Sequence, residues 1–283
     1  MSAEPSQIAP DGTGINPADQ RVARQLAEAV TAAGALALDM FSRGVETWTK
    51  GDNSPVTAAD LAVDRFLNQT LLSIAPEWGW LSEETADNDA RLQAQRVWVV
   101  DPIDGTRGFM SGAPDWAVSA AVVEDGVPVI GALFAPVTGE LFTALRGGGA
   151  RRNGALLKAN ERDSLNGASA AGPNDALDAL ERAAPITRLP RGYSLALRIA
   201  RVATGEMDIA LSRANSHDWD LAAADLLVRE AGARLTTYDD APLRYNAPVP
   251  RHASLICAGA ALHGPALAAA RADTFPQRQP DRA

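Results

Sequence analysis

Two aspartates, Asp101 and Asp104, stand at the end of an apolar run in "WVVDPIDGT" (residues 98–106). We expect Asp101 to end a buried strand, because Pro102 fixes φ and lacks the N–H that a strand ladder needs. Two carboxylates forced together raise one another's pKa unless a cation intervenes. An oxygen-seeking ion such as Mg²⁺ therefore fits this pair, with the Ile103 carbonyl turned toward the same space.

The two residues that follow could hold an anion. Gly105 permits a close backbone approach, and Thr106 could open a helical turn whose free N–H groups face an anion. The motif alone is equally compatible with a plain turn, where Asp-Pro and Asp-Gly pairs are common.

Two further acidic motifs bear on this choice. "LSEET" places Glu83 and Glu84 shortly before the same strand, although a surface turn has the same composition. "HDWDLAAADLL" sets Asp218 and Asp220 around Trp219 at the start of a helix. There Asp220 could simply interact with the helix N-terminal dipole, and Trp219 is expected to belong to the core.

The composition limits the classes of partner. The 283 residues are 46% hydrophobic, which suffices for a substantial core, and carry a formal charge of -9. That charge argues against a nucleic-acid polymer or an anionic membrane as partner. A single cysteine, Cys257, excludes an internal disulfide framework and is expected to be a buried strand residue. With three histidines, a hard cation fits better than zinc.

The two ends of the chain are predicted to be loose tails, and the residues between them are predicted to form two halves. Residues 1–18 have neither the basic start nor the apolar run of a secretory signal, and no stretch is long enough to span a membrane. We expect a cytoplasmic protein with a tail at 1–18, a half at 19–150, a half at 151–272 and a tail at 273–283. The two halves are not expected to fold separately.

The first half is predicted to combine helices with an antiparallel sheet. Helices are expected at 19–41 and 57–74, the second opening with a capping box at Thr57–Asp60. A strand covered on both faces is expected at 96–101, a three-stranded meander at 116–145, and a hinge at 146–154. The side chains expected to face inward are Val22, Leu26, Val30, Ala33, Ala37, Met40, Leu61, Phe66, Leu67 and Leu71.

The second half is predicted to alternate short strands with helices, which indicates a layered α/β arrangement. Helices are expected at 194–205 and 220–232, the latter stopped by Gly232, and strands at 207–212, 233–238 and 253–259.

Taken in order, "SPVTAAD", "LSEET", "WVVDPIDGT" and "HDWDLAA" resemble the inositol monophosphatase family of magnesium-dependent, lithium-sensitive phosphatases, which includes 3'(2'),5'-bisphosphate nucleotidases. The resemblance runs from about Val22 to His263. It implies a layered αβαβα sandwich, a homodimer, and two or three Mg²⁺ ions for which Mn²⁺ could substitute.

The resemblance also implies roles for site residues. Glu83, Asp101 and the Ile103 carbonyl would bind one metal, and Asp101, Asp104 and Asp220 a second. Asp60 and the Thr106 hydroxyl would be the catalytic pair that polarises the attacking water, and the Gly105 and Thr106 N–H groups would hold the phosphate. From the residues alone, Asp60 is also explained as a helix cap.

The identity of the small phosphate monoester is open. Inositol-selective relatives usually carry an acidic residue seven positions before the aspartate of the Trp-Asp pair, where this chain has Arg213. A guanidinium suits a second anion, so we favour a bisphosphate nucleotide such as 3'-phosphoadenosine 5'-phosphate. Lys50 could add positive charge. Arg213 and Arg107 could equally be solvated surface residues.

Alternative substrates are inositol 1-phosphate, histidinol phosphate or a sugar bisphosphate. An alternative of another class is a non-catalytic, metal-dependent regulatory binding protein. The presence of both Asp60 and Thr106 favours the enzyme, because such binding proteins often lose the water-activating pair.

Overall fold

The computed structural model describes residues 15–43, 47–49 and 55–274. Most of the two expected tails and Lys50 lie outside these residues. Helix α1 (Pro17–Arg43) already begins within the segment expected to be tail. No helix of the described residues is long and apolar enough to cross a membrane.

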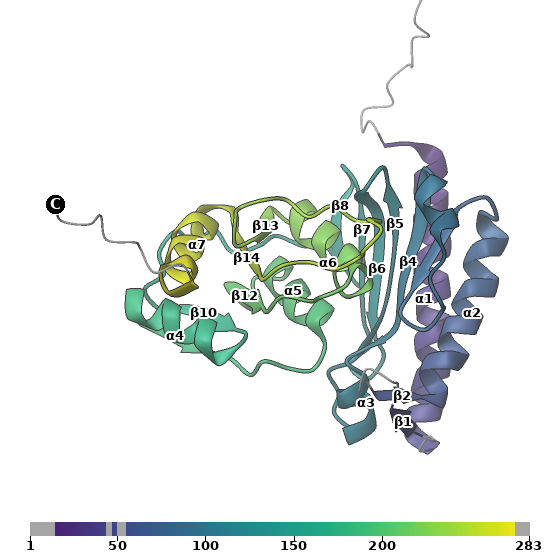
Figure 1. The fold of residues 1–283 in the computed structure, drawn as a ribbon, viewed down its shortest axis with the longest axis horizontal. Coiled ribbons are helices and arrows are strands. Elements are labelled where there is room, and N and C mark those ends of the chain that lie inside the picture. Colours follow the sequence, from purple (N-terminus) through teal and green to yellow (C-terminus); the bar gives the residue numbers. More distant parts are fainter. Residues whose placement is uncertain (1–14, 44–46, 50–54, 275–283) are drawn as a thin grey trace, which may run out of the picture.

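The elements stack in five layers, which confirms the predicted αβαβα sandwich (Figure 1). Helices α1 and α2 (Ala58–Ile74) cover the outer face of a seven-stranded sheet. Helices α5 (Leu195–Ala203) and α6 (Asp218–Glu230) fill the space between this sheet and a five-stranded one. Helices α4 (Asn174–Ala183) and α7 (Ala260–Thr274) cover the far side of the second sheet.

The seven-stranded sheet has the order β3-β4-β5-β6-β7-β8-β9. Strands β3 and β4 are parallel and all later pairs are antiparallel, which confirms the meander. The strands are β3 (Gly79–Ser82), β4 (Arg96–Asp104), β5 (Ala117–Glu124), β6 (Val127–Ala135), β7 (Glu140–Leu145), β8 (Gly149–Arg152) and β9 (Ala155–Leu156).

The expected hinge at 146–154 is wrong. Its glycines make a tight turn, with Gly147 and Gly149 at positive φ, and the chain then returns as β8 alongside β7. Because glycine allows both a hinge and a hairpin turn, the sequence did not separate the two.

The five-stranded sheet has the order β11-β10-β12-β14-β13. It contains β10 (Ala168–Ala171), β11 (Ile186–Arg188), β12 (Ile209–Ser212), β13 (Ala233–Thr237) and β14 (Leu255–Gly259). The predictions of β12, β13, β14, α5 and α6 are confirmed, and Gly232 ends α6 with a φ of 87°. Four further elements of this half, β10, α4, β11 and α7, were not predicted from the sequence. Strands β1 (Thr47–Thr49) and β2 (Pro55–Thr57) and the 3₁₀ helix η1 (Asp89–Gln93) were also not predicted, whereas α3 (Thr106–Ser111) begins at the residue that was expected to open a helical turn.

The inward faces of α1 and α2 follow the predicted spacing with one exception. In α1 all the predicted positions are buried except Met40, which is half-buried, and in α2 Leu67 and Leu71 are buried while Phe66 is half-buried. Leu61 is 39% exposed, so its inward placement is wrong. It lies about 200° around the helix from the buried Val63.

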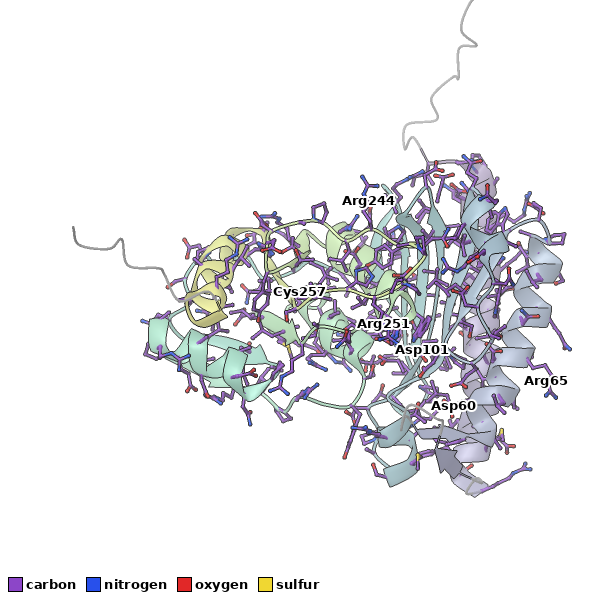
Figure 2. The ribbon with its side chains drawn as sticks, viewed as in Figure 1. Asp60, Arg65, Asp101, Arg244, Arg251 and Cys257 are labelled. Carbon is purple, nitrogen blue, oxygen red and sulfur yellow. The ribbon has the colours of Figure 1, made fainter. Side chains whose placement is uncertain are left out.

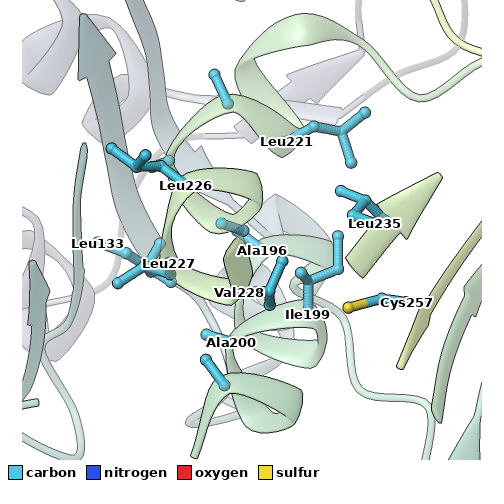
Figure 3. Close-up of a cluster of buried hydrophobic side chains, with 14 of the residues drawn as sticks. Leu133, Ala196, Ile199, Ala200, Leu221, Leu226, Leu227, Val228, Leu235 and Cys257 are labelled. Carbon is cyan, nitrogen blue, oxygen red and sulfur yellow. The ribbon is translucent and has the colours of Figure 1, made fainter. Parts of the chain in front are cut away.

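The layer between the sheets forms the largest buried apolar cluster (Figure 3). Leu227 of α6 lies beside Leu133 of the first sheet, while Ile199 of α5 lies beside Cys257 of the second. Cys257 is fully buried in β14, as expected. This packing fixes α5 and α6 relative to β4, so side chains from the ends of these elements can meet.

We predict that Gly259→Ala destabilises the second sheet. A Cβ at Gly259 would lie 2.2 Å from the backbone carbonyl oxygen of Asn160, which cannot turn away as a side chain could. The expected loss is about 1–3 kcal/mol in the free energy of unfolding, measured by denaturant titration. Ala261→Ser, which also adds one heavy atom but at an exposed position nearby, should change it by less than about 0.5 kcal/mol. Equal stability of the two variants would contradict the close approach.

Candidate active site

Three carboxylates from two distant parts of the chain meet between the layers. One oxygen each of Asp101, Asp104 and Asp220 lies within 4.8 Å of the others. Asp101 and Asp104 are buried at the end of β4, and Asp220 is half-buried near the start of α6. The predicted convergence of these three residues is therefore present.

The end of β4 is irregular, and this irregularity turns both aspartates toward one place. Asp101 pairs with Ser119 and Asp104 with Ala117, with a register shift between them. Pro102 therefore interrupts the ladder but does not end it, contrary to expectation. The Asp101 Oδ1 accepts a hydrogen bond from the Ile103 N–H at 3.0 Å, which fixes the carboxylate over the bulge.

Asp104 is held by the first turn of α5. One of its oxygens accepts a bond from the Ala196 N–H at 2.7 Å, and the other from the Leu195 N–H at 3.3 Å. The Ser194 hydroxyl also donates to Asp104 and accepts from the Leu197 N–H at 3.0 Å. Ser194 was not predicted to be part of the site. A serine directly before an apolar helix signals an N-cap, but the signal does not reveal a partner ninety residues away.

Asp220 is the third residue of α6 and is fixed by its own helix. Its Oδ2 accepts a bond from the N–H of His217, the N-cap residue, at 2.8 Å. The His217 ring stacks on Trp219 at 4.5 Å. Trp219 is half-buried and packs against the core, as expected.

Asp60 and Thr106, the expected catalytic pair, are joined by a hydrogen bond. The Thr106 hydroxyl lies 3.2 Å from Asp60 Oδ1 and 3.1 Å from the Ile103 carbonyl oxygen. Asp60 also completes the predicted capping box of α2, accepting from the Thr57 N–H at 2.8 Å and from the Thr57 hydroxyl at 2.6 Å. Figure 2 shows Asp60 and Asp101 near the same end of the first sheet.

Glu83 follows β3 directly, and its N–H donates to the Val100 carbonyl at 3.3 Å. Its charge contributes to the raised pKa of both Asp101 and Asp220. Glu83 also lines a cavity of about 430 Å³ whose other lining residues are Gly105, Thr106, Arg107, Arg191, Gly192 and Tyr193. Gly105 has a φ of 95°, a conformation that glycine adopts without strain.

The electrostatics of the acidic cluster call for a cation. Burial raises the pKa of Asp101 well above its usual value, and the neighbouring Glu83 and Asp104 raise it further. The pKa of Asp220 is likewise raised well above its usual value, by burial and by Asp104.

Hydrogen bonds and one buried cation oppose these shifts at the other two aspartates. Burial also raises the pKa of Asp104, although the hydrogen bond from Ser194, the N–H groups of α5 and the positive charge of Arg198 lower it. Burial raises the pKa of Asp60, and the bonds from Thr57 and Thr106 offset part of that rise. Clustered carboxylate oxygens are the donors that Mg²⁺ prefers, so this set fits a hard divalent ion.

Arg213 is not brought to this cavity. Its guanidinium forms an exposed ion pair with Asp175 of α4 at 3.0 Å. Together with Tyr238 and Ser254, it lines a separate cavity of about 370 Å³. A role of Arg213 in substrate binding stays a prediction, whereas Arg107 does line the cavity beside Glu83.

Comparison with known proteins supplies a family for this arrangement. Residues 18–274 match the sequence model described as the inositol monophosphatase family. A histidinol-phosphatase of Mycobacterium tuberculosis is 38% identical over 204 residues, which cover 68% of this chain and 77% of that protein. The 3'(2'),5'-bisphosphate nucleotidase CysQ of Aggregatibacter actinomycetemcomitans is 31% identical over 216 residues, which cover 73% of this chain and 80% of the relative.

A solved structure shares the fold. The structure of an IMPase/NADP phosphatase complexed with Mg²⁺ and phosphate superposes with a TM-score of 0.80. The match covers 93% of this chain and 99% of that one, at 22% identity. At this identity the likeness shows the common architecture alone.

We predict that stabilisation by Mg²⁺ increases with pH. Because their pKa values are raised, the cluster aspartates stabilise the metal-free fold below about pH 4 and lose that contribution as pH rises through the raised values. Mg²⁺ needs the ionised forms, so the gain in unfolding temperature from Mg²⁺ over chelator should grow from about pH 5 to pH 8. At about 100 times the Kd of Mg²⁺ the gain corresponds to about 2.7 kcal/mol.

The matched control for this measurement is Asp101→Asn, which removes one charge at nearly constant shape. Its unfolding temperature should depend less on both pH and Mg²⁺ than that of the wild type. A stabilisation by Mg²⁺ that is independent of pH, or that survives in Asp101→Asn, would show that the ion binds elsewhere.

Proposed function

The chain is a member of the inositol monophosphatase family of phosphatases, and from this premise we propose that it hydrolyses a small phosphate monoester with Mg²⁺, with 3'-phosphoadenosine 5'-phosphate as the favoured substrate class. The observation that supports the chemistry most directly is the cluster of the buried Asp101 and Asp104 with the half-buried Asp220. The family is metal-dependent, and these residues supply oxygen donors.

The proposed metal ligands are those that the family resemblance implies, and three of them are the aspartates of the cluster. Glu83, Asp101 and the Ile103 carbonyl would hold one Mg²⁺, and Asp101, Asp104 and Asp220 a second. When bound, these ions supply positive charge to the phosphate oxygens and lower the pKa of a bound water. Because all the donors are oxygens, Mn²⁺ should also bind in place of Mg²⁺. The proposal also includes a third Mg²⁺ ion.

The chain's own contribution to water activation lies in the pair of Asp60 and Thr106. The Thr106 hydroxyl carries one proton, and donating it to Asp60 leaves the hydroxyl oxygen free to accept a hydrogen bond from a water. Thr106 would thus orient the nucleophile, and Asp60 acts through it as a positioning residue. The N–H groups of Gly105 and Thr106 are proposed to hold the phosphate.

The proposal also concerns which alcohol carries the phosphate group of the substrate. Relatives named histidinol-phosphatase, inositol-1-monophosphatase and bisphosphate nucleotidase all match this chain at about 30–38% identity, so each is a candidate activity. The bisphosphate nucleotide is favoured because arginines, rather than additional acids, line the cavity next to Thr106. We also propose lithium sensitivity, a homodimer and a cytoplasmic location, on the family resemblance alone.

We predict that Asp60→Asn lowers kcat by about 100-fold or more. The amide of the new side chain can donate a hydrogen bond to the Thr106 hydroxyl oxygen, and the Thr106 proton then points away from residue 60. The variant should bind Mg²⁺ with an affinity close to that of the wild type, measured calorimetrically. Asp39→Asn, at an exposed carboxylate of α1, should leave kcat unchanged. Retained turnover in Asp60→Asn would contradict the proposed role of Asp60.

A panel of phosphate monoesters tests the proposed function. With Mg²⁺, phosphate release should be fastest from 3'-phosphoadenosine 5'-phosphate, slower from inositol 1-phosphate and histidinol phosphate, and reduced by Li⁺. No release from any of them would reject the phosphatase. Arg213→Glu tests the earlier prediction for Arg213: an unchanged nucleotide-to-inositol ratio would leave Arg213 as a surface residue paired with Asp175.

A further inference from the structure

Two arginines stand at the mouth of the acidic site on different elements. Arg107 is the second residue of α3, directly after Thr106, and Arg191 lies in the loop between β11 and α5, three residues before Ser194. Both side chains are exposed, and both line the cavity that contains Glu83 and Thr106. Within the described part of the chain, neither forms an ion pair with a carboxylate.

What distinguishes Arg107 and Arg191 is their position at this cavity, because other exposed arginines of the described residues, such as Arg65 and Arg244, also form no ion pair. Some arginines elsewhere in the described residues are each bound to two acids. Arg96 is bonded to Asp19 and Glu124, and Arg201 to Glu140 and Glu206. Among the residues that the structure describes, Arg107 and Arg191 have no such pair of acids, and both line the cavity beside Thr106.

A third arginine, in α5, adds positive charge next to the loop that carries Arg191. Arg198 is buried in α5, and its Nη1 donates to the Leu211 carbonyl at 2.8 Å. Burial lowers the pKa of Arg198 to about 10, and the charge of Arg191 contributes to this shift. Arg191 and Arg198 line the same cavity, so both contribute positive charge there, although the negative charge of Asp104 offsets part of that of Arg198.

A larger cavity of about 540 Å³ adjoins the first. The two share Arg191, Gly192 and Tyr193 in their walls. Apolar side chains of the larger cavity come from Pro114, Pro190, Leu197 and Met207. Its carboxylate, Asp115, accepts a hydrogen bond from the Tyr193 N–H and has no bond to Arg107 or Arg191 among the described residues. The space therefore suits an organic ring next to a cationic entrance.

We propose that Arg107 and Arg191 bind a second phosphate carried by the leaving alcohol, and that the adjoining cavity receives the ring system of that alcohol. The inference rests on the proposed phosphatase function and identifies residues that select its substrate. A guanidinium pairs strongly with phosphate oxygens, contributes nothing comparable to a neutral polyol, and repels a cationic amino alcohol. Charge on the leaving group thus becomes the basis of selection.

The contribution of these arginines should appear mainly in KM. They line the cavity beside Gly105 and Thr106, where the reacting phosphate is proposed to bind. A second phosphate keeps its charge throughout the reaction, so it is bound equally in the ground state and the transition state. One hydrogen bond to a charged group contributes about 1.5–3 kcal/mol, which corresponds to roughly a 10- to 100-fold change in affinity.

The experiment compares two substrates that differ only in the second phosphate: 3'-phosphoadenosine 5'-phosphate and adenosine 3'-monophosphate. In the Mg²⁺-loaded wild type, kcat/KM should favour the bisphosphate by about 10- to 100-fold. Arg107→Gln and Arg191→Gln should each reduce this ratio by about three- to tenfold through KM, and the double variant should bring it near one. The matched control is Arg65→Gln, at an exposed position on the outer side of α2 far from Asp101 (Figure 2), which should keep the ratio.

A binding measurement gives a readout without turnover. Adenosine 5'-monophosphate, the product of the bisphosphate, should bind the Mg²⁺-loaded wild type at least about tenfold more tightly than adenosine, and this difference should vanish in the double variant. Thermal unfolding should show that each variant is folded.

The outcomes separate the inference from the function on which it rests. A wild type that cleaves monoesters without preferring the second phosphate, or that prefers histidinol phosphate, would overturn the inference and leave the phosphatase intact. A preference that persists in the double variant would also overturn it, because the second phosphate would then be bound by other residues. Failure to cleave any monoester would instead reject the phosphatase function.

Discussion

The structure depends on bringing acidic side chains together in a place where they repel one another. Asp60, Asp104 and Asp220 are each fixed by N–H groups at the start of a helix: α2, α5 and α6, respectively. The positive ends of three helix dipoles therefore face the cluster and partly offset the repulsion. The raised pKa values of Asp101 and Asp220 show that the compensation is incomplete without a cation.

The five layers explain how these helix starts reach one point. Strand β4 lies within the first sheet and delivers Asp101 and Asp104 through its irregular end. Helices α5 and α6 are wedged between the two sheets by apolar packing, so their N-termini are held against that end. The second half of the chain thus supplies Asp220, the bonds that orient Asp104, and the arginine-bearing loop at the entrance. Neither half contains the whole site.

Local signals in the sequence predicted the parts of the site that depend on neighbouring residues. The capping box of Thr57 and Asp60, the aspartates at the end of an apolar strand, and the start of α6 at Asp218 all arise within a few residues. Partners set by packing were not predictable in this way, as with Ser194 and Asp104, whose bond depends on how two layers meet. Leu61 shows the same limit, since helical spacing predicts a stripe but does not fix its edge.

The central claim is that these converged carboxylates bind divalent cations. The most direct measurement is anomalous X-ray diffraction from crystals of the protein grown with saturating Mn²⁺. The structure predicts at least one Mn²⁺ peak within about 2.2 Å of oxygens from both Asp101 and Asp220, with Asp104 or Glu83 completing the ligand set. Well-ordered carboxylates with no Mn²⁺ peak between them, or a peak only at other acidic residues, would contradict the account.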